Sequence, residues 1–181
     1  MKLEGKRLIW NDYQKEIAED KYYYARSCIR QNFWPGSESV FLKILKEELG
    51  KDIHDDPIHT SCTGIGYHTD VVPFETTMTV VARQFSLMTE TGYENFLPSC
   101  ITSFGLYTEI LETWHHFPEV EVKVREDLFK ATKREFSIPK NLAHTSDVIF
   151  KFRHEIAQKG KFRLLNVKTG KPLRVDRKSV V

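Results

Sequence analysis

Two short apolar segments, each ending at a cysteine, constrain the fold of this chain most. The segment KYYYARSC at 21–28 is rich in aromatic residues and suits a β-strand that ends at Cys28. The segment ENFLPSC at 94–100 suits a second short strand that ends at Cys100. Helical patterns follow both segments, and such alternation is typical of α/β proteins. The sequence therefore predicts an α/β fold with a parallel sheet flanked by helices.

Apolar side chains at helical spacing predict the helices around these strands. After a loop at 30–39, this spacing predicts a helix over 40–51, with Ser37 or Ser39 as its cap. Gly92 is predicted to end the helix over 73–93. The other predicted helices cover 73–93, 101–117, 118–136, which begins at Pro118, and 146–160, which is capped by Ser146.

The remaining segments predict loops, turns and the limits of the domain. The segment 52–70 is polar and turn-rich, so we expect a long loop around Cys62. The segment 161–175 alternates around a Lys-Thr-Gly turn and predicts a C-terminal β-hairpin. The last six residues, DRKSVV, fit neither a strand nor a helix cap. The predicted organisation is a charged extension at 1–20, one domain at 21–175 and a non-native tail at 176–181.

Composition excludes several classes of protein. Hydrophobic residues make up 40% and charged residues 29% of the 181 positions, as in an ordinary soluble domain. No apolar run approaches the roughly 20 residues of a membrane span, and the N-terminus lacks the apolar core of a secretory signal. Three cysteines are too few for a disulfide framework. We therefore expect reduced thiols and a cytoplasmic location.

Basic residues gather at the C-terminal end of the chain. From Lys151 to Lys178 the sequence has ten Lys or Arg residues against two acids, Glu155 and Asp176. Such asymmetry can mark nucleic-acid binding, but the interleaved aromatic pattern of a nucleic-acid-binding module does not accompany it. We interpret the basic end as a solvated face or as a docking surface for an acidic partner, and we expect no nucleic acid.

Cys28, Cys62 and Cys100 are the candidate site residues. The first and last lie at predicted strand ends, where ligands of open α/β sheets bind, and Cys62 lies in a loop that is free to join them. Three thiolates can bind zinc with a fourth ligand, hold an iron–sulfur cluster or carry out thiol–disulfide exchange. His59 and His68 are alternative fourth ligands for zinc. Buried cysteines with no site function remain an alternative.

Motifs of other site classes are missing from the sequence. It contains no C-x-x-C pair, no phosphate loop that ends in Gly-Lys-Ser/Thr, no G-x-S-x-G elbow and no H-E-x-x-H helix. An ordinary zinc ribbon, a thioredoxin-type site, a hydrolase and a nucleotide-binding enzyme therefore have no positive support.

The residues around the three cysteines form a spaced pattern over about 21–175. Cys28 is followed by IRQNFWPGSES, SCTG surrounds Cys62, and PSCITSFGLYTE surrounds Cys100. Gaps of 33 and 36 residues separate these features. The pattern resembles the cysteine-rich CCG domain found in the B-subunit family of heterodisulfide reductase. In that family one cysteine, a Cys-Cys pair and a C-x-x-C motif supply five cysteines that hold a noncubane 4Fe–4S cluster.

Two positions depart from the pattern of that family. Thr63 stands at the second position of the Cys-Cys pair, and Ser103 stands at the second position of C-x-x-C. A hydroxyl is a poor ligand for the soft metals of iron–sulfur chemistry. For Cys28, Cys62 and Cys100, a zinc ion, a simpler cluster and an empty structural site all stay open.

The resemblance implies the N-terminal half of a longer polypeptide that carries two such domains. The parent would be an oxidoreductase subunit that holds iron–sulfur clusters, works with other subunits of a soluble complex and transfers electrons to a disulfide or related sulfur substrate. This half would be structural or metal-binding and inactive alone. Because the chain breaks off after KPLRV, we expect the natural gene to continue. The alternative is a zinc-binding structural or protein-interaction domain with no redox role.

Overall fold

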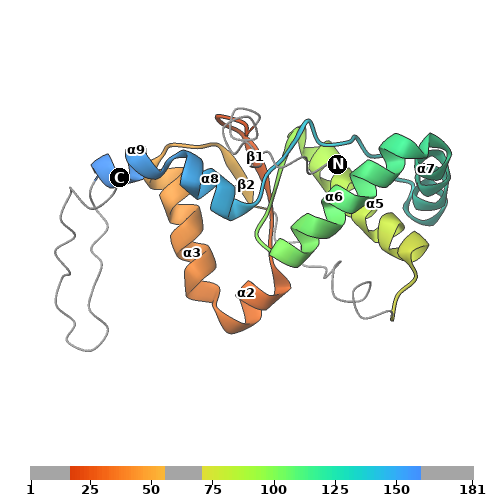
Figure 1. Ribbon diagram of the computed structural model, residues 1–181, viewed down its shortest axis with the longest axis horizontal. Coiled ribbons are helices and arrows are strands. Elements are labelled where there is room, and N and C mark those ends of the chain that lie inside the picture. The colour runs from red at the N-terminus through yellow and green to blue at the C-terminus, as the bar shows by residue number, and fades with distance from the viewer. Residues whose placement is uncertain (1–16, 56–70, 160–181) are drawn as a thin grey trace, which may run out of the picture.

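The computed structural model of this chain describes residues 17–55 and 71–159. These residues form a parallel sheet with helices on both faces and the strand order β2-β1-β3-β4 (Figure 1), which confirms the predicted α/β class. The predicted hairpin at 161–175 lies outside the described residues, as does the predicted tail. The strands are β1 (Tyr22–Ala25), β2 (Ile53–Asp55), β3 (Asn95–Pro98) and β4 (Asn141–Leu142).

The helices form two layers, one on each face of the sheet. In Figure 1, α5, α6 and α7 lie on one side, and α3, α8 and α9 lie on the other. Side chains of β1 alternate between these layers, so that Tyr23 enters one core while Tyr22 and Tyr24 enter the other. The helices are α2 (Cys28–Phe33), α3 (Pro35–Lys43), the π-helical η1 (Ile44–Glu48), α5 (Phe74–Thr91), α6 (Ile101–His116), α7 (Pro118–Thr132), α8 (Thr145–Lys151) and α9 (Arg153–Lys159).

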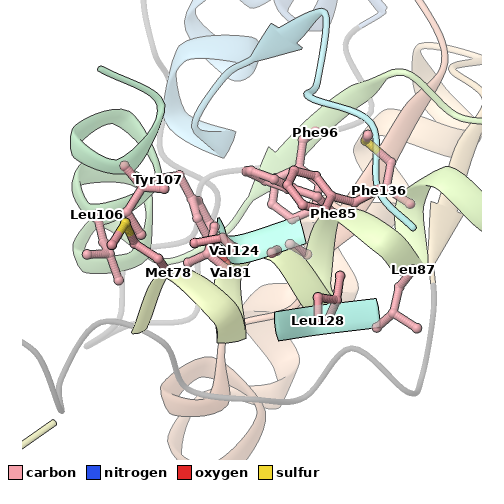
Figure 2. Close-up of a cluster of buried hydrophobic side chains, with 14 of the residues drawn as sticks. Met78, Val81, Phe85, Leu87, Phe96, Leu106, Tyr107, Val124, Leu128 and Phe136 are labelled. Atoms are coloured by element: carbon pink, nitrogen blue, oxygen red, sulfur yellow. The ribbon is translucent and has the colours of Figure 1, made fainter. Parts of the chain in front are cut away.

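Aromatic side chains dominate the core beneath α5, α6 and α7 (Figure 2). The ring of Phe85 on α5 meets Phe96 of β3 edge-on, with ring centroids 5.1 Å apart. Trp114 of α6 packs against Phe136, with a centroid distance of 5.3 Å. These contacts fix α6 on the sheet, and the residue at its N-terminus is therefore held by the main core.

The core on the opposite face is smaller and holds a buried polar pair. Phe41 of α3 stacks on Tyr24 of β1, with ring centroids 5.8 Å apart. The Tyr24 hydroxyl donates a hydrogen bond of 3.0 Å to the Glu38 carboxylate, and both residues are buried. This bond gives the buried carboxylate a partner and ties α3 to the central strand.

The long helices confirm the predictions made from the spacing of apolar residues. Helices were expected over 73–93, 101–117 and 118–136, and α5, α6 and α7 occupy these segments. Gly92 ends α5 in the left-handed conformation with φ 77°, as its position predicts. The third helix ends earlier than expected, because Lys133 adopts φ 60°.

The prediction of a strand to Cys28 and a loop at 30–39 was wrong. Strand β1 ends at Ala25, and Cys28 begins helix α2. The Ser27 hydroxyl caps this helix by accepting a hydrogen bond of 3.3 Å from the Arg30 N–H. Pro35 then starts α3, because proline suits the first turn of a helix.

Short elements account for the other differences. The segment 52–70 was expected to be a loop, but its start forms β2, and the two-residue strand β4 was not predicted. The helix expected over 146–160 is divided at Phe152 into α8 and α9. Its cap is His144, whose ring Nδ1 accepts a hydrogen bond of 3.3 Å from the Ser146 N–H, so the predicted cap was wrong.

Candidate thiol site

Cys28 and Cys100 follow two neighbouring strands at the carboxyl edge of the sheet. β1 and β3 are paired in parallel, with Ala25 opposite Pro98. Cys28 is the first residue of α2, and Cys100 is the N-cap of α6. The Ser99 N–H donates a hydrogen bond of 3.1 Å to the Ala25 carbonyl, which joins the two strand ends just before the cysteines. Both cysteines are half-buried.

The other predicted ligands lie outside the described residues. These are Cys62 and the alternative zinc ligands His59 and His68. Among residues 17–55 and 71–159, no group of three or more His, Cys, Asp or Glu side chains is arranged to hold a metal ion. A metal site with three or more such ligands would therefore need at least one ligand from outside the described residues.

The first turn of α6 favours the thiolate form of Cys100. Burial raises the pKa of the Cys100 thiol, but hydrogen bonds from the backbone and hydroxyl groups of Ser103 and Thr102 outweigh it. The net effect is a pKa of Cys100 below the ordinary value of a thiol. The thiolate is the form that binds metals and attacks disulfides. The start of α6 is therefore prepared for either chemistry.

Ser103 stands where a site for a five-cysteine cluster has a cysteine ligand. It occupies the second position of the C-x-x-C motif, and its backbone and hydroxyl groups lower the pKa of the Cys100 thiol. With Thr63 at the other departure, the whole sequence holds only three cysteines. These residues do not fit a noncubane cluster that needs five. Three thiols and one further ligand fit a zinc ion or a smaller cluster.

A bidentate ion pair fixes the strand ends next to Cys28. Arg26 Nε and Nη2 each donate to the Asp55 carboxylate at 2.6 Å. The two side chains are 26% and 17% exposed. The pair joins the end of β1 to the end of β2, directly before the segment 56–70 that carries Cys62.

A pocket of about 660 Å³ opens beside Cys100, between α3 and the first turn of α6. Its walls are largely apolar, and Arg30 is the one Lys, Arg, Asp or Glu among the described residues that line it. Of the two cysteines that the structure describes, only Cys100 is on the wall. The lining residues are Ser27, Ile29, Arg30, Trp34, Ser37, Val40, Phe41, Ile44, Ser99, Cys100, Ile101, Thr102, His144 and Ile149.

His144 is a buried polar residue of this pocket that the sequence analysis did not select. Burial lowers the pKa of the His144 ring, and the nearby Arg30 acts in the same direction. Its Nδ1 accepts from the Ser146 N–H, which places the proton of the neutral ring on Nε2. Nε2 itself makes no hydrogen bond of good geometry. The signal in the sequence is His144-Thr-Ser-Asp147, where Asp147 completes a capping box.

The amino-acid sequence is similar to one component of a reductase. It is 26% identical over 161 residues to the B subunit of the ferredoxin:CoB-CoM heterodisulfide reductase of Methanosarcina acetivorans. The match covers 85% of this chain and 51% of that protein, so the chain spans about half the length of this relative. No family model matches the chain. The similarity supports the resemblance found in the cysteine pattern.

The fold is also similar to a solved structure. A crystal structure of a hypothetical protein from Helicobacter pylori matches with a TM-score of 0.56 and 14% sequence identity. The match covers 89% of this chain and 32% of that chain. At this identity the likeness concerns the fold alone.

Among the helices that the structure describes, none has the length and apolar character needed to cross a bilayer.

Proposed function

We propose that this chain acts as one half of a heterodisulfide-reductase-B-like subunit in a cytoplasmic redox complex. In this proposal the parent transfers electrons to a disulfide or related sulfur substrate and works with other subunits. This half holds a metal ion or a small iron–sulfur cluster through Cys28, Cys62 and Cys100, and it does not turn over substrate alone. The similarity over 85% of the chain supports the family, and the placement of two thiols at one sheet edge supports the site.

The thiolate-favouring environment of Cys100 carries the metal-binding part of this proposal. A cysteine must lose its proton to bind a metal, and this loss is part of the cost of binding. The N-terminus of α6 reduces that cost through the hydrogen bonds of Thr102 and Ser103. A cysteine that only filled the core would not need such partners.

Each residue of the site has a separate role in this proposal. Cys100 and Cys28 are ligands on adjacent strand ends, and Cys62 closes the site from the segment between them. Ser103 stabilises the sulfur of Cys100 and is not a ligand. A bound zinc ion would cross-link the strand ends, whereas a bound small cluster would carry an electron. The basic C-terminal end is the docking surface for an acidic partner subunit.

Metal and acid-labile sulfide analysis of the full chain after anaerobic purification tests this proposal. Iron together with sulfide supports the redox role of this half. Loss of metal in Cys62→Ser with an unchanged circular dichroism spectrum shows that the site is not needed for folding. A Thr63→Cys, Ser103→Cys double variant restores five cysteines and should raise the iron content. A chain with neither iron nor zinc, or one that reduces a disulfide substrate alone, contradicts the proposal.

The second candidate is a zinc-binding structural domain with no redox role. The three cysteines support it, because with His59 or His68 they complete a four-ligand zinc site. About one zinc per chain without sulfide favours this candidate over the cluster. His59→Ala and His68→Ala then identify the fourth ligand, because only the ligand variant lowers the zinc content. Equal zinc content in both variants excludes a histidine ligand.

A further inference from the structure

Exposed hydrophobic side chains gather around the mouth of the pocket beside Cys100. Four of them line the pocket, and the ring of the fifth, Phe33, lies 6.1 Å from that of Trp34. Each is between 42% and 72% exposed. We call this set the apolar rim. It consists of Ile29, Phe33 and Trp34 from α2 and the turn that follows, Val40 from α3 and Ile101 from α6.

The apolar rim is large enough to form the centre of a stable interface. Its exposed side chains amount to on the order of 500 Å², at the upper end of what soluble monomers leave in one patch. A standard interface buries roughly 800 Å² on each partner. Polar atoms at the edge of the rim can supply the remainder. An uncovered patch of this size is unfavourable in water, which points to a covering partner.

The shape of the rim favours a second copy of this chain as the partner. Figure 1 shows that the corner between α2 and α3 projects away from the sheet. Phe33 lies at this corner and is 72% exposed, which makes it a projecting aromatic residue. The pocket opens next to it, with mainly apolar walls of a size that accepts a phenyl ring. A projection beside a matching hollow is self-complementary, as a two-fold interface requires.

The charges of the rim are compatible with this partner. Among the described residues that line the pocket, Arg30 is the only Lys, Arg, Asp or Glu, and Glu38 is buried against Tyr24. Two copies therefore meet without carboxylates from these walls facing each other, and each copy brings one Arg30 to the interface. The Arg30 guanidinium can stack on an aromatic ring of the other copy. The mainly apolar surface of the walls favours an apolar protein surface over a small polar ligand.

We propose that two copies of this chain associate through the apolar rim about a two-fold axis. Phe33 of each copy inserts into the pocket of the other copy. Trp34 and Ile101 pack around the axis and exclude water from this contact. The proposal goes beyond the proposed function and does not depend on whether a metal is bound.

Sedimentation velocity of the full chain from low to high micromolar concentration tests the dimer. The wild-type chain should show a concentration-dependent dimer, and Phe33→Ser should weaken it roughly 30-fold or more, as expected for a central aromatic contact. The matched control is Phe129→Ser on α7, at a residue that is 47% exposed and lies outside the rim; this variant should leave the dimer unchanged. Circular dichroism of both variants should match the wild type.

A mixture of two variants tests the reciprocal geometry. Ser37→Trp fills the mouth of the pocket but leaves Phe33 in place, whereas Phe33→Ser leaves the pocket open. Each variant alone should be largely monomeric. Mixed, they retain one insertion and should form a heterodimer of intermediate affinity. The proposal is overturned if the wild type stays monomeric, if its dimer is insensitive to Phe33→Ser, or if the mixture associates no better than either variant.

Discussion

The two helices that begin at the cysteines, α2 and α6, are anchored in different ways. Helix α6 has 16 residues and buries a stripe that includes Ile110 and Trp114 in the main core. Helix α2 has six residues, and none of them is buried. Cys100 is therefore positioned by tertiary packing, whereas Cys28 is positioned by a cap and by the strand end before it. The two thiols therefore follow adjacent strands but lie on helices that are anchored to different extents.

The two helices also differ in the residue at the N-cap. In α6 the cap residue is Cys100 itself; its sulfur makes no capping hydrogen bond of good geometry, but the neighbouring Ser103 and Thr102 lower the pKa of its thiol. In α2 the cap residue is Ser27, whose hydroxyl accepts from the Arg30 N–H. Cys28 lies one residue after the cap of its helix, whereas Cys100 is the cap of its helix. A hydroxyl therefore stands at the N-terminus of α2, and a thiol stands at the N-terminus of α6. The difference teaches that the position of a cysteine relative to the start of the helix decides which side chain stands at the cap.

Truncation in each helix gives the largest expected contrast. Trp114→Ala should lower the free energy of unfolding by about 3–5 kcal/mol, because the side chain is 1% exposed and leaves a cavity. Ile29→Ala should cost less than about 1 kcal/mol, because α2 contributes no buried residue. Urea unfolding of the full chain measures both values. Equal losses of unfolding free energy in the two variants would contradict the difference in anchoring between α6 and α2.

The ion pair before Cys28 gives a smaller effect. Arg26→Ala should cost about 1–2 kcal/mol, because a partly buried carboxylate then loses two charge-assisted hydrogen bonds. The matched control is Lys140→Ala, which removes an exposed pair with Glu94 and should cost at most about 0.5 kcal/mol. The same unfolding measurement compares them. A negligible loss for Arg26→Ala would mean that this pair does not hold the strand ends.

The sequence predicts the long elements of this fold better than the short ones. The helical spacing over 73–93 and 101–117 is sustained for four turns or more, and burial follows it. Strands β2 and β4 have three and two residues, and they form because a neighbouring strand offers hydrogen bonds. Such pairing depends on tertiary structure, so local pattern does not reveal it.

The positions of Cys28 and Cys100 in the fold were predictable, but the walls of the pocket were not. A cysteine after an apolar segment is visible in one sequence, and Cys28 and Cys100 lie at the expected edge of the sheet. The pocket joins residues from α2, α3 and α6 with His144, which precedes α8. These segments meet only after the sheet has formed. Arg30 and His144 could therefore not be assigned to one site from their positions in the chain.

Removal of one hydroxyl gives the smallest expected effect and refines the comparison at Cys100. Ser103→Ala should raise the pKa of the Cys100 thiol, because its hydrogen bond lowers that pKa in the folded protein. At neutral pH the thiolate fraction falls, so alkylation of Cys100 by iodoacetamide becomes slower. The pH dependence of the rate, followed on the Cys100 peptide by mass spectrometry, measures the shift.

A matched variant on the same helix controls for the loss of a hydroxyl. Thr108 lies on the exposed side of α6, and its hydroxyl donates to the Phe104 carbonyl. Thr108→Val should leave the pKa of Cys100 unchanged. An alkylation profile that is identical in Ser103→Ala and the wild type would contradict the role of Ser103.

Cobalt(II) titration of the reduced, metal-free full chain tests the central claim, that thiols from both strand ends bind one metal. Cobalt replaces zinc in tetrahedral sites, and thiolate ligands give it a charge-transfer band in the near ultraviolet. The account predicts this band in the wild type, with a lower intensity and weaker binding in both Cys28→Ser and Cys100→Ser. A band that either variant leaves unchanged, or no band in the wild type, would contradict a shared site.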